Sequence, residues 1–459
     1  MTSTKIKYPL LLVVALFILF LSGCKVGPKY ARPDYNTDTT YRFAAGYDTV
    51  SFADTSWTYL FRDSVLRNLI VRGLQNNFDL KIAYERVNQA RASFKEARAE
   101  MWPSIGISGA AEYNNIANPL AGGSVEYHDF YATANLSWEL DIWGKMRRQK
   151  ESSMADLLAQ EAYQQGIRIS LIAEIASAYF NLLEYQDELQ ITRYNVQIRE
   201  KSLELNKYKM IAGTASGLVV AQAEAELALV VSKVPVLERA VALQEDGIRM
   251  LLGQLPGPVP TGDSILYQIN TDIIPKEGIP SQLIVRRPDI IQVEQQLISA
   301  NAQVGVARAK MLPTIGISAN IGYSYSAAGI IGSAIGNLVA PIFSFGKLKA
   351  GFRRSQAYKE EMLATYQKTI YNGIREVSDG IVSVEKQKQV VAANQNLMAA
   401  AQTAYNLSDQ LYNAGYASYL DVLDAQRTLY QAQVSLSQAQ NDQLLYVVSL
   451  YLALGGGWK

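Results

Sequence analysis

Two regions of the chain alternate apolar and polar side chains with a period of two. Because successive side chains of a strand point to opposite faces, this pattern predicts strands with one apolar and one polar face. We therefore expect a β-hairpin at about residues 104–141 and another at about 313–345, whose last strand, about Ile335–Phe345, alternates less cleanly. The alternating apolar positions are Ile105, Ile107, Ala111, Phe130, Ala132, Ala134, Leu136, Trp138 and Leu140 in the first region and Ile315, Ile317, Ala319, Ile321 and Tyr323 in the second.

The segments around the hairpins carry a helical pattern. Good helix formers ending near a proline predict helices at Asn76–Met101 and Pro288–Met311, one ahead of each hairpin. After the hairpins, we expect long helices from Lys145 to about Ala212 and from Lys347 to about Ala414, each followed by a tight glycine turn and a shorter helix back. At about 1.5 Å per residue, a helix of that length spans on the order of 100 Å, which no compact globular domain needs.

This order of elements occurs twice because the chain is internally repeated. The segment Ala97–Ser108 reappears, with few changes, as Ala307–Ser318. Duplication of a whole structural unit is the simplest account, with repeats at residues 68–254 and 286–459. The Pro/Gly-rich residues 255–285 are then the linker between the repeats.

The first residues have the layout of a secretory signal. Two lysines precede the apolar run Leu10–Leu21, and Leu21-Ser22-Gly23-Cys24 resembles the bacterial lipoprotein signal. We expect a signal peptide at residues 1–23, cleavage before Cys24, and a covalent lipid such as palmitate on the Cys24 thiol. Residues 24–67 are then a lipidated, extended N-terminal segment; an uncleaved anchor is the alternative.

The composition mainly excludes classes of protein. The 43 basic and 42 acidic residues nearly balance and 49% of the chain is hydrophobic, so a disordered chain is excluded and no nucleic-acid partner is expected. With one histidine, His128, and one cysteine, the chain lacks the side chains for a Cys/His zinc site or a histidine-dependent triad. We expect no catalytic residue, no metal and no cofactor beyond the lipid.

Four strands cannot close a barrel, and a bilayer tolerates no open sheet edge because unpaired backbone groups there cost several kcal/mol each. If the strands span a membrane, the chain must oligomerise: two copies would supply about eight strands and three would supply about twelve. The helices fit the wall of a hollow tube, because small residues permit close helix packing on two sides and leave two other faces for water. Many Ala, Ser and Gln residues lie between the members of an apolar stripe formed by Leu397, Ala401, Ala404, Leu407 and Leu411. The alternatives are a soluble half-buried sheet for the strands and a solid bundle or an extended coiled coil for the helices.

Three motifs resemble those of the outer membrane efflux protein family, and most closely the TolC-like lipoprotein outer-membrane factors of tripartite efflux systems. They are Cys24-Lys25-Val26-Gly27-Pro28-Lys29-Tyr30-Ala31-Arg32-Pro33, Arg287-Pro288-Asp289-Ile290, and Tyr412-x-x-Gly415 followed by Asp421-Val422-Leu423-Asp424-Ala425-Gln426. The resemblance implies a mixed α and transmembrane β fold, in which a duplicated unit of long antiparallel helices plus a β-hairpin forms a homotrimer. The trimer would comprise a 12-stranded outer-membrane β-barrel continued by a periplasmic α-helical barrel.

The function implied by the resemblance is a passive, gated duct in the outer membrane that extends into the periplasm. It would export small molecules received from an inner-membrane pump through a periplasmic adaptor. A lipid-anchored periplasmic coiled-coil scaffold without a pore is the alternative, although it has no use for four alternating strands. An enzyme is a distant third, because no nucleophile–base pair or phosphate loop is visible.

The resemblance also assigns the gate. It places Asp421, Asp424 and Tyr412 at the periplasmic aperture and Gly213 and Gly415 in the tip turns. The two aspartates are three residues apart and share a helix face. If that face lines a trimeric tube, six carboxylates converge, and repulsion with partial desolvation would raise some of their pKa values and favour cations.

Two neighbouring residues bear on this gate. Ala417 stands where TolC has an arginine that links neighbouring coils, so closure here would rest on other contacts. Arg427 follows Asp424 by about one helical turn; it either neutralises part of the carboxylate ring or forms a surface ion pair of little energy.

Overall fold

The computed structural model describes residues 25–34, 41, 56–118, 123–262 and 282–456. The predicted signal peptide, Cys24 and most of the predicted linker lie outside the described residues. The chain forms two compact units. Unit 1 consists of Met1–Tyr35, Glu85–Ala162 and Gln292–Lys368, and unit 2 consists of Asn36–Tyr84, Tyr163–Ile291 and Thr369–Lys459. Each unit therefore takes segments from both halves of the sequence.

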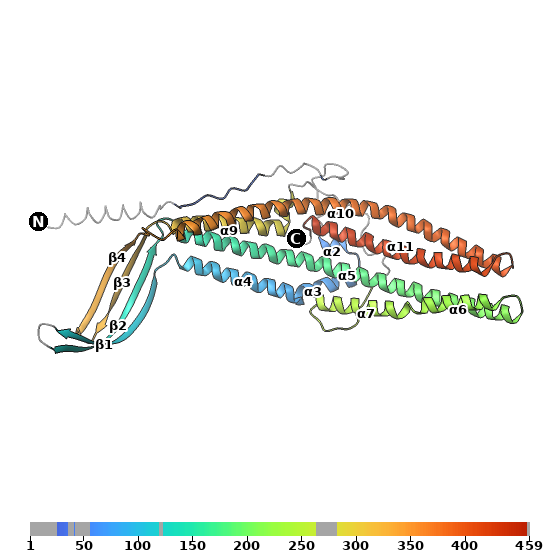
Figure 1. The fold of residues 1–459 in the computed structure, drawn as a ribbon, viewed down its shortest axis with the longest axis horizontal. Helices are drawn as coiled ribbons and strands as arrows, with labels where there is room; N and C mark the ends of the chain where they lie inside the picture. The colour runs from blue at the N-terminus through green and yellow to red at the C-terminus, as the bar shows by residue number, and fades with distance from the viewer. Residues whose placement is uncertain (1–24, 35–40, 42–55, 119–122, 263–281, 457–459) are drawn as a thin grey trace. The chain divides into compact units, whose positions relative to one another are not determined.

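Unit 1 contains one antiparallel sheet of four strands, in the order β1-β2-β3-β4 (Figure 1). The strands are β1 (Ser104–Asn118), β2 (Gly123–Leu140), β3 (Thr314–Ser324) and β4 (Gly329–Val339). Strands β1 and β2 form one hairpin and β3 and β4 the other, and the β2–β3 pair joins the two. Strands β1 and β4 are the edges of the described sheet.

The strand register separates an apolar from a polar row. Ile107 lies opposite Ala134, which lies opposite Ile321 on the next strand. Their neighbours on the other face are polar, and Ser108 is within hydrogen-bond distance of Thr133 (3.1 Å between hydroxyl oxygens). In the apolar row, Ile107 is 86% exposed and Ile321 is 62% exposed. The chain therefore presents an apolar sheet face with nothing packed on it in the part that the structure describes.

The fourth strand lies earlier in the chain than the sequence predicts. It was expected at about Ile335–Phe345, but β4 runs from Gly329 to Val339. Pro341 has no backbone N–H to donate to a ladder, and Phe345 has a positive φ of 47°, so neither belongs to a strand here. The blurred alternation has a cause in the register, because Gly332 and Gly336 occupy the apolar row while Ile331 and Ile335 fall in the polar one.

The long helices begin and end close to their predicted positions. Helix α5 spans Lys145–Ile211 and α10 spans Lys347–Asn413, each of 67 residues. The helices ahead of the hairpins are α4 (Phe78–Ala99) and α9 (Pro288–Ala309). Among the described helices, only α5 has an 18-residue window apolar enough to cross a membrane, and 56% of that window is buried, so its packing accounts for its apolar character.

The remaining helices belong to unit 2. They are α2 (Trp57–Leu60), α3 (Ser64–Asn76), α6 (Gly217–Val231), α7 (Val234–Leu251), α8 (Leu283–Arg286) and α11 (Tyr419–Ala453). Helix α3 packs closely on α5, because a Cβ added to Gly73 would lie 2.3 Å from the Ile175 side chain. Phe61 and Phe180 pack edge to face there, with ring centroids 6.1 Å apart.

The returning helix of the first repeat is broken, whereas that of the second is continuous. We expected one shorter helix after each tip turn, and α11 meets that expectation with 35 residues. In the first repeat, α6 ends at Val231 and α7 begins at Val234. The break follows from Pro235, whose ring would clash with the carbonyl of Val231 and which has no N–H for the helix ladder.

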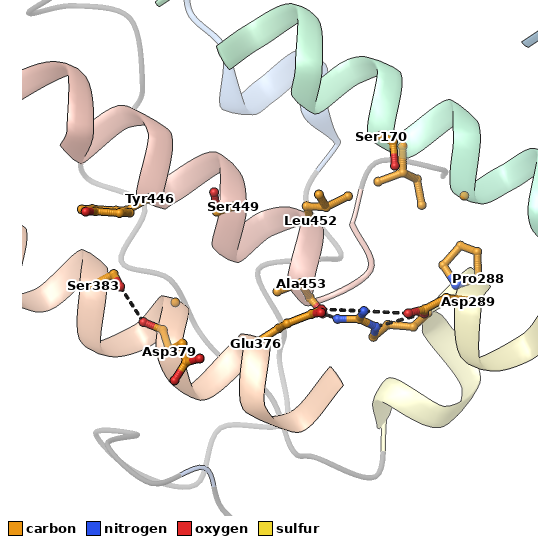
Figure 2. Close-up of a pocket in the computed structure, with 14 residues that line it drawn as sticks. Ser170, Pro288, Asp289, Glu376, Asp379, Ser383, Tyr446, Ser449, Leu452 and Ala453 are labelled. Atoms are coloured by element: carbon orange, nitrogen blue, oxygen red, sulfur yellow. Dashed lines mark hydrogen bonds and ion pairs between the residues drawn. The ribbon is translucent and has the colours of Figure 1, made fainter. Parts of the chain in front are cut away.

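Within unit 2, a side chain near the start of each repeat bonds to the end of the last helix of that repeat. We call these two equivalent places the joints. In the first, the Asn77 side chain donates to the carbonyl of Leu251 at the end of α7 (2.9 Å). In the second, Arg287 Nη1 donates to the carbonyl of Ala453 at the end of α11 (2.8 Å). The second joint is charged, since Arg287 also pairs with Asp289 and Glu376, beside a cavity of about 560 Å³ (Figure 2).

A glycine follows the last helix at each joint, and its backbone requires glycine. Gly253 has φ +66° and Gly455 has φ +77°. A Cβ on Gly253 would lie 2.6 Å from the carbonyl oxygen of Asn76, which backbone atoms cannot accommodate without moving. The glycine thus lets the end of α7 approach the end of α3.

We predict that Gly253→Ala destabilises the protein more than Gly213→Ala does. Both glycines have a positive φ, but a Cβ on Gly213 meets open space. The Gly213 variant should cost about 1–2 kcal/mol from backbone strain alone, and the Gly253 variant about 1–3 kcal/mol more from the clash. Denaturant midpoints of the two purified variants measure the difference, and equal midpoints would contradict the close approach at the joint.

Candidate functional site

Two glycine turns end the long helices, as the sequence predicts. Gly213 and Gly415 have φ values of +75° and +84°. The amide of Thr214 donates to the Lys209 carbonyl (2.8 Å), and the amide of Tyr416 donates to the Leu411 carbonyl (2.8 Å). Each bond satisfies a carbonyl at the end of its helix and reverses the chain, as in the Schellman motif. These two turns define the tips of unit 2.

Asp421 caps α11. Its carboxylate accepts hydrogen bonds from the Ser418 amide (2.8 Å) and the Ser418 hydroxyl (2.7 Å), while Ser418 Oγ accepts from the Asp421 amide (3.4 Å). These bonds to Ser418 lower the pKa of Asp421 below its usual value, so the carboxylate is ionised at neutral pH. The pattern Ser-x-x-Asp ahead of a helix is a capping-box signal that is visible in the sequence.

Asp424 lies one turn further along α11, on the same face as Asp421 by its spacing. The assignment of both carboxylates to a gate stays a prediction, because the aperture would require several chains. In the first repeat, Ser216 is the N-cap of α6 and makes no side-chain capping bond. The capping carboxylate is therefore specific to the second tip within the described residues.

Tyr412 ties the end of α10 to α5 within one chain. Its hydroxyl donates to Asn206 Oδ1 (2.5 Å), and Lys209 Nζ lies 3.7 Å from the centre of its ring. The ring also packs against Tyr419 at the start of α11, with centroids 5.6 Å apart. Burial raises the pKa of Tyr412, so the hydroxyl remains a hydrogen-bond donor throughout the physiological range.

A charged node lies below the tips and joins three helices. Glu226 of α6 is 5% exposed and forms ion pairs with Arg199 of α5 and Arg427 of α11. Burial alone would raise the pKa of Glu226, but the two guanidinium groups hold it below its usual value. Arg427 Nε donates to Glu226 Oε1 (2.9 Å), so the side chain that was expected to neutralise the carboxylate ring or to form a surface ion pair bonds to a buried carboxylate of a different helix.

An apolar cluster covers the node on the side of the tips. It is formed by Ala223, Tyr419, Val422 and Leu423, with Leu203, Val219, Tyr405 and Tyr412 packed against it. Residues from α5, α6, α10 and α11 contribute, so the two tip hairpins of one chain share a core. Glu226 and Arg199 could not be predicted from the sequence, because their partners are distant along the chain and no local pattern marks them.

A second group of carboxylates lies further along the contact between α5 and α11. Glu184 is 5% exposed, and burial together with Glu188, Asp187 and Asp442 raises its pKa from 4.5 to about 7. Asp187 accepts a hydrogen bond from Ser437 of α11 (2.5 Å). Among the described residues, no group of three or more His, Cys, Asp or Glu side chains is arranged to hold a metal ion.

The family of the chain follows from this architecture and from comparison with known proteins. Residues 69–254 and 279–456 match the model of the outer membrane efflux protein family, and the chain belongs to that family. It is 31% identical to the toluene efflux pump outer membrane protein TtgC of Pseudomonas putida, over 98% of this chain and 96% of that protein. It is 27% identical to the cation efflux system protein CusC of Escherichia coli, over 96% of this chain and 97% of that protein.

Solved structures give the same result. The outer-membrane channel OprN matches with a TM-score of 0.88 and 28% identity, covering 95% of this chain and 100% of that one. CusC matches with a TM-score of 0.85 and 26% identity, again covering 95% and 100%. The predicted family and fold class are confirmed: the protein is an outer-membrane efflux protein with the fold of TolC-like channels, and it is not an enzyme.

We predict that Glu226→Gln destabilises the tip hairpins by about 3–5 kcal/mol, because it leaves the buried Arg199 without its counter-charge. Glu224→Gln is the matched control. Glu224 lies two residues away on the same helix, and its ion pair with Lys207 is half-exposed, so its loss should cost less than about 1 kcal/mol. Hydrogen exchange across α6 measures both, and equal protection in the two variants would show that the node contributes little.

We predict that Glu184→Gln stabilises the protein at pH 8 but hardly at pH 5. The folded pKa of about 7 lies above the unfolded value of 4.5, so wild-type stability falls as pH rises through that window. The glutamine variant escapes this loss, which amounts to about 2–3 kcal/mol once Glu184 is fully ionised. Thermal unfolding midpoints at the two pH values test this, and a constant offset between variant and wild type would contradict it.

Proposed function

We propose that the protein is the outer-membrane channel of a tripartite efflux system, a passive, gated duct that exports small molecules. The observation that carries the proposal is the four-stranded sheet with its exposed apolar row, in a chain of the outer membrane efflux protein family. Such a face is stable against lipid, and the long helices α5 and α10 supply the wall of a periplasmic conduit. Energy for transport would come from the pump.

The duct would be a homotrimer. One chain offers two strand edges, β1 and β4, whose backbone groups need partners in a bilayer. Pairing β4 of one chain with β1 of the next removes every edge, and three chains give a barrel of about twelve strands. The family resemblance supports three copies over two.

The N-terminus would carry a lipid on Cys24 after cleavage of the signal peptide. Cys24 lies outside the described residues, so the proposal rests on the sequence signal. A lipid chain adds membrane affinity in proportion to its buried methylene groups and would hold the chain at the outer membrane together with the barrel.

The adaptor and the pump would meet the duct at its periplasmic end. Both tip turns expose large apolar side chains next to their glycines: Ile211 is 80% exposed, Leu218 68%, Tyr416 84% and Leu420 58%. Leu218 and Leu420 stand five residues after the glycine of each tip, and exposed apolar residues at both tips favour a protein partner there. TtgC and CusC are named as components of a toluene efflux pump and a cation efflux system; the cargo of this duct would be set largely by its own pump.

The gate would be the ring of Asp421 and Asp424 carboxylates from three chains. Asp421 is held ionised by its bonds to Ser418, which adds fixed negative charge at the constriction. Cations would be attracted to such a ring and anions repelled. Tyr412, which bonds Asn206 in the same chain, would hold the closed arrangement in place of the arginine that Ala417 replaces.

We predict a small, cation-selective single-channel current from the purified protein in lipid, blocked by a multivalent cation such as hexamminecobalt. Asp421→Asn/Asp424→Asn should weaken the block about tenfold or more, because charge attraction at the ring is lost. Asparagine is chosen because its side-chain oxygen at position 421 can still accept the hydrogen bond from the Ser418 amide. Glu204→Gln, on the exposed surface of α5 near the tip, is the control and should leave the block unchanged.

The outcomes separate the alternatives. Equal block in the wild type and the double variant would keep the duct and remove these residues from the gate. No current from protein shown to be membrane-inserted, with an apparent mass of one or two chains, would favour the scaffold without a pore.

A further inference from the structure

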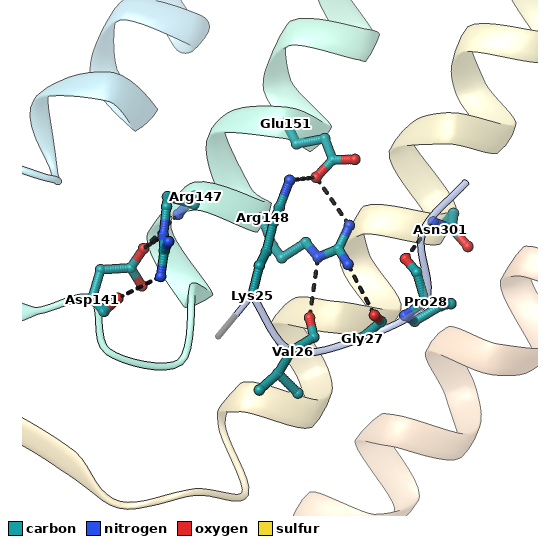
Figure 3. Close-up of polar contacts among 9 residues, drawn as sticks. All are labelled: Lys25, Val26, Gly27, Pro28, Asp141, Arg147, Arg148, Glu151 and Asn301. Atoms are coloured by element: carbon teal, nitrogen blue, oxygen red, sulfur yellow. Dashed lines mark hydrogen bonds and ion pairs between the residues drawn. The ribbon is translucent and has the colours of Figure 1, made fainter. Parts of the chain in front are cut away.

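The first described residues, 25–32, lie as an extended strap across helices α5 and α9 of unit 1 (Figure 3). They contain most of the N-terminal family motif and form neither helix nor strand. Their contacts with the helices are numerous, directional and buried, which is unusual for the end of a chain.

Arg148 is the centre of these contacts. Its side chain is 2% exposed, and its guanidinium donates to two strap carbonyls, from Nε to Val26 (3.1 Å) and from Nη2 to Gly27 (3.0 Å). Nη1 donates to Glu151 (3.0 Å), which also pairs with Lys25. The buried guanidinium therefore has partners on all three nitrogens, two of them in the strap.

Two glycines allow the strap to lie against α9. A Cβ on Gly27, whose φ is +104°, would lie 2.5 Å from the Cα of Gly305. A Cβ on Gly305 would lie 2.9 Å from both Arg148 Nε and the Val26 carbonyl oxygen. Asn301, one turn earlier on α9, donates to the Pro28 carbonyl (3.0 Å). The seat is thus shaped by α5 and α9 together.

A second attachment lies further along the strap. Arg32 binds Glu294 of α9 in a bidentate pair, with distances of 2.7 and 2.8 Å, and Tyr30 donates to the same carboxylate (3.1 Å). Glu294 is 4% exposed, so these are hydrogen bonds to a buried charge and are stronger than surface ion pairs.

The seat lies at the foot of the strands that join the two repeats. The amide of Val26 donates to the carbonyl of Trp143, three residues after β2 ends (3.0 Å). The indole of Trp143 donates to the carbonyl of Pro313, the residue before β3 (2.6 Å). Trp143 therefore connects the start of the strap to two places, the end of β2 and the start of β3.

We propose that residues 25–32 are a docked strap, fixed by Arg148, which holds the lipid attachment point in register with the foot of the membrane sheet rather than on a flexible tether. The inference rests on the proposed lipidation of Cys24, which precedes Lys25 directly. A lipid fixed at this place enters the leaflet beside the strand ends, and any pull on it passes to both repeats through α5 and α9.

A spin label at position 29 tests the strap. Lys29 is exposed and makes no contact in the seat described above, and Cys24 is the only cysteine, so Lys29→Cys adds one labelling site to the full-length protein. We expect a restrained spectrum in the otherwise wild-type protein. Arg148→Met should raise the mobile fraction about tenfold or more, because two charge-assisted hydrogen bonds to the strap are lost.

Three further variants guard against a folding defect. Gly305→Ala places a methyl group in the seat while favouring the helix, so it should also release the label without weakening α9. The controls are Arg193→Met on α5, which removes an exposed ion pair with Glu238, and Gly351→Ala on α10, whose added Cβ meets open space. Both controls should keep the restrained spectrum.

The number of labels per chain separates this proposal from the lipidation on which it rests. One label per chain means that the Cys24 thiol is blocked, and two mean that it is free, which would contradict the lipid itself. One label per chain with a mobile spectrum in the wild type would overturn the strap. A restrained spectrum in both Arg148→Met and Gly305→Ala would overturn the seat.

Discussion

The constraint on which the rest of the molecule depends is that backbone N–H and C=O groups in a bilayer need hydrogen-bond partners. The four-stranded sheet satisfies this constraint between its strands and leaves it unmet at β1 and β4. Its exposed apolar row also needs an apolar environment, because side chains such as Ile107 are not covered by the described part of the chain. The two strand edges and the apolar row therefore both need partners that the described part of the chain does not supply.

The duplicated sequence explains how two hairpins come to lie side by side, but the repeats are not equivalent. The joint of the first is closed by the neutral Asn77 and that of the second by the charged Arg287. The second tip carries the capping Asp421, and the first tip supplies Glu226 to a node shared by both. The two repeats thus use different polar and charged side chains at equivalent positions of the fold.

Elements with a local signal were predicted well from the sequence. Alternation predicted three of the four strands, and the paired glycines marked the ends of α5 and α10 to within a residue or so. The fourth strand was misplaced because glycines interrupt its apolar row, and the break before α7 was missed although Pro235 marks it. Ser418 and Asp421 form a visible capping pattern, yet the aspartate was interpreted only as a gate residue.

The contacts that carry charge into the interior could not be predicted in the same way. Arg147 and Arg148 are adjacent and identical in type, but one is partly exposed beside Asp141 and the other is buried beneath the strap. Only the tertiary position of α9, with Gly305 facing Arg148, distinguishes them. Glu226 is likewise one of two glutamates on α6, and its burial depends on partners in α5 and α11.

The break between α6 and α7 has a mechanical consequence. A continuous helix such as α11 transmits a rotation from one end to the other, because each turn is bonded to the next. Two helices separated at Ser232 and Lys233 can change their mutual angle at that point without breaking further ladder bonds. Helix α11 therefore keeps its hydrogen-bond ladder from Tyr419 to Ala453, whereas the returning chain of the first repeat has a weak point at Pro235 where it can bend. The duplicated repeats therefore differ in stiffness: the returning helix of the second is continuous, and that of the first has a flexible point between α6 and α7.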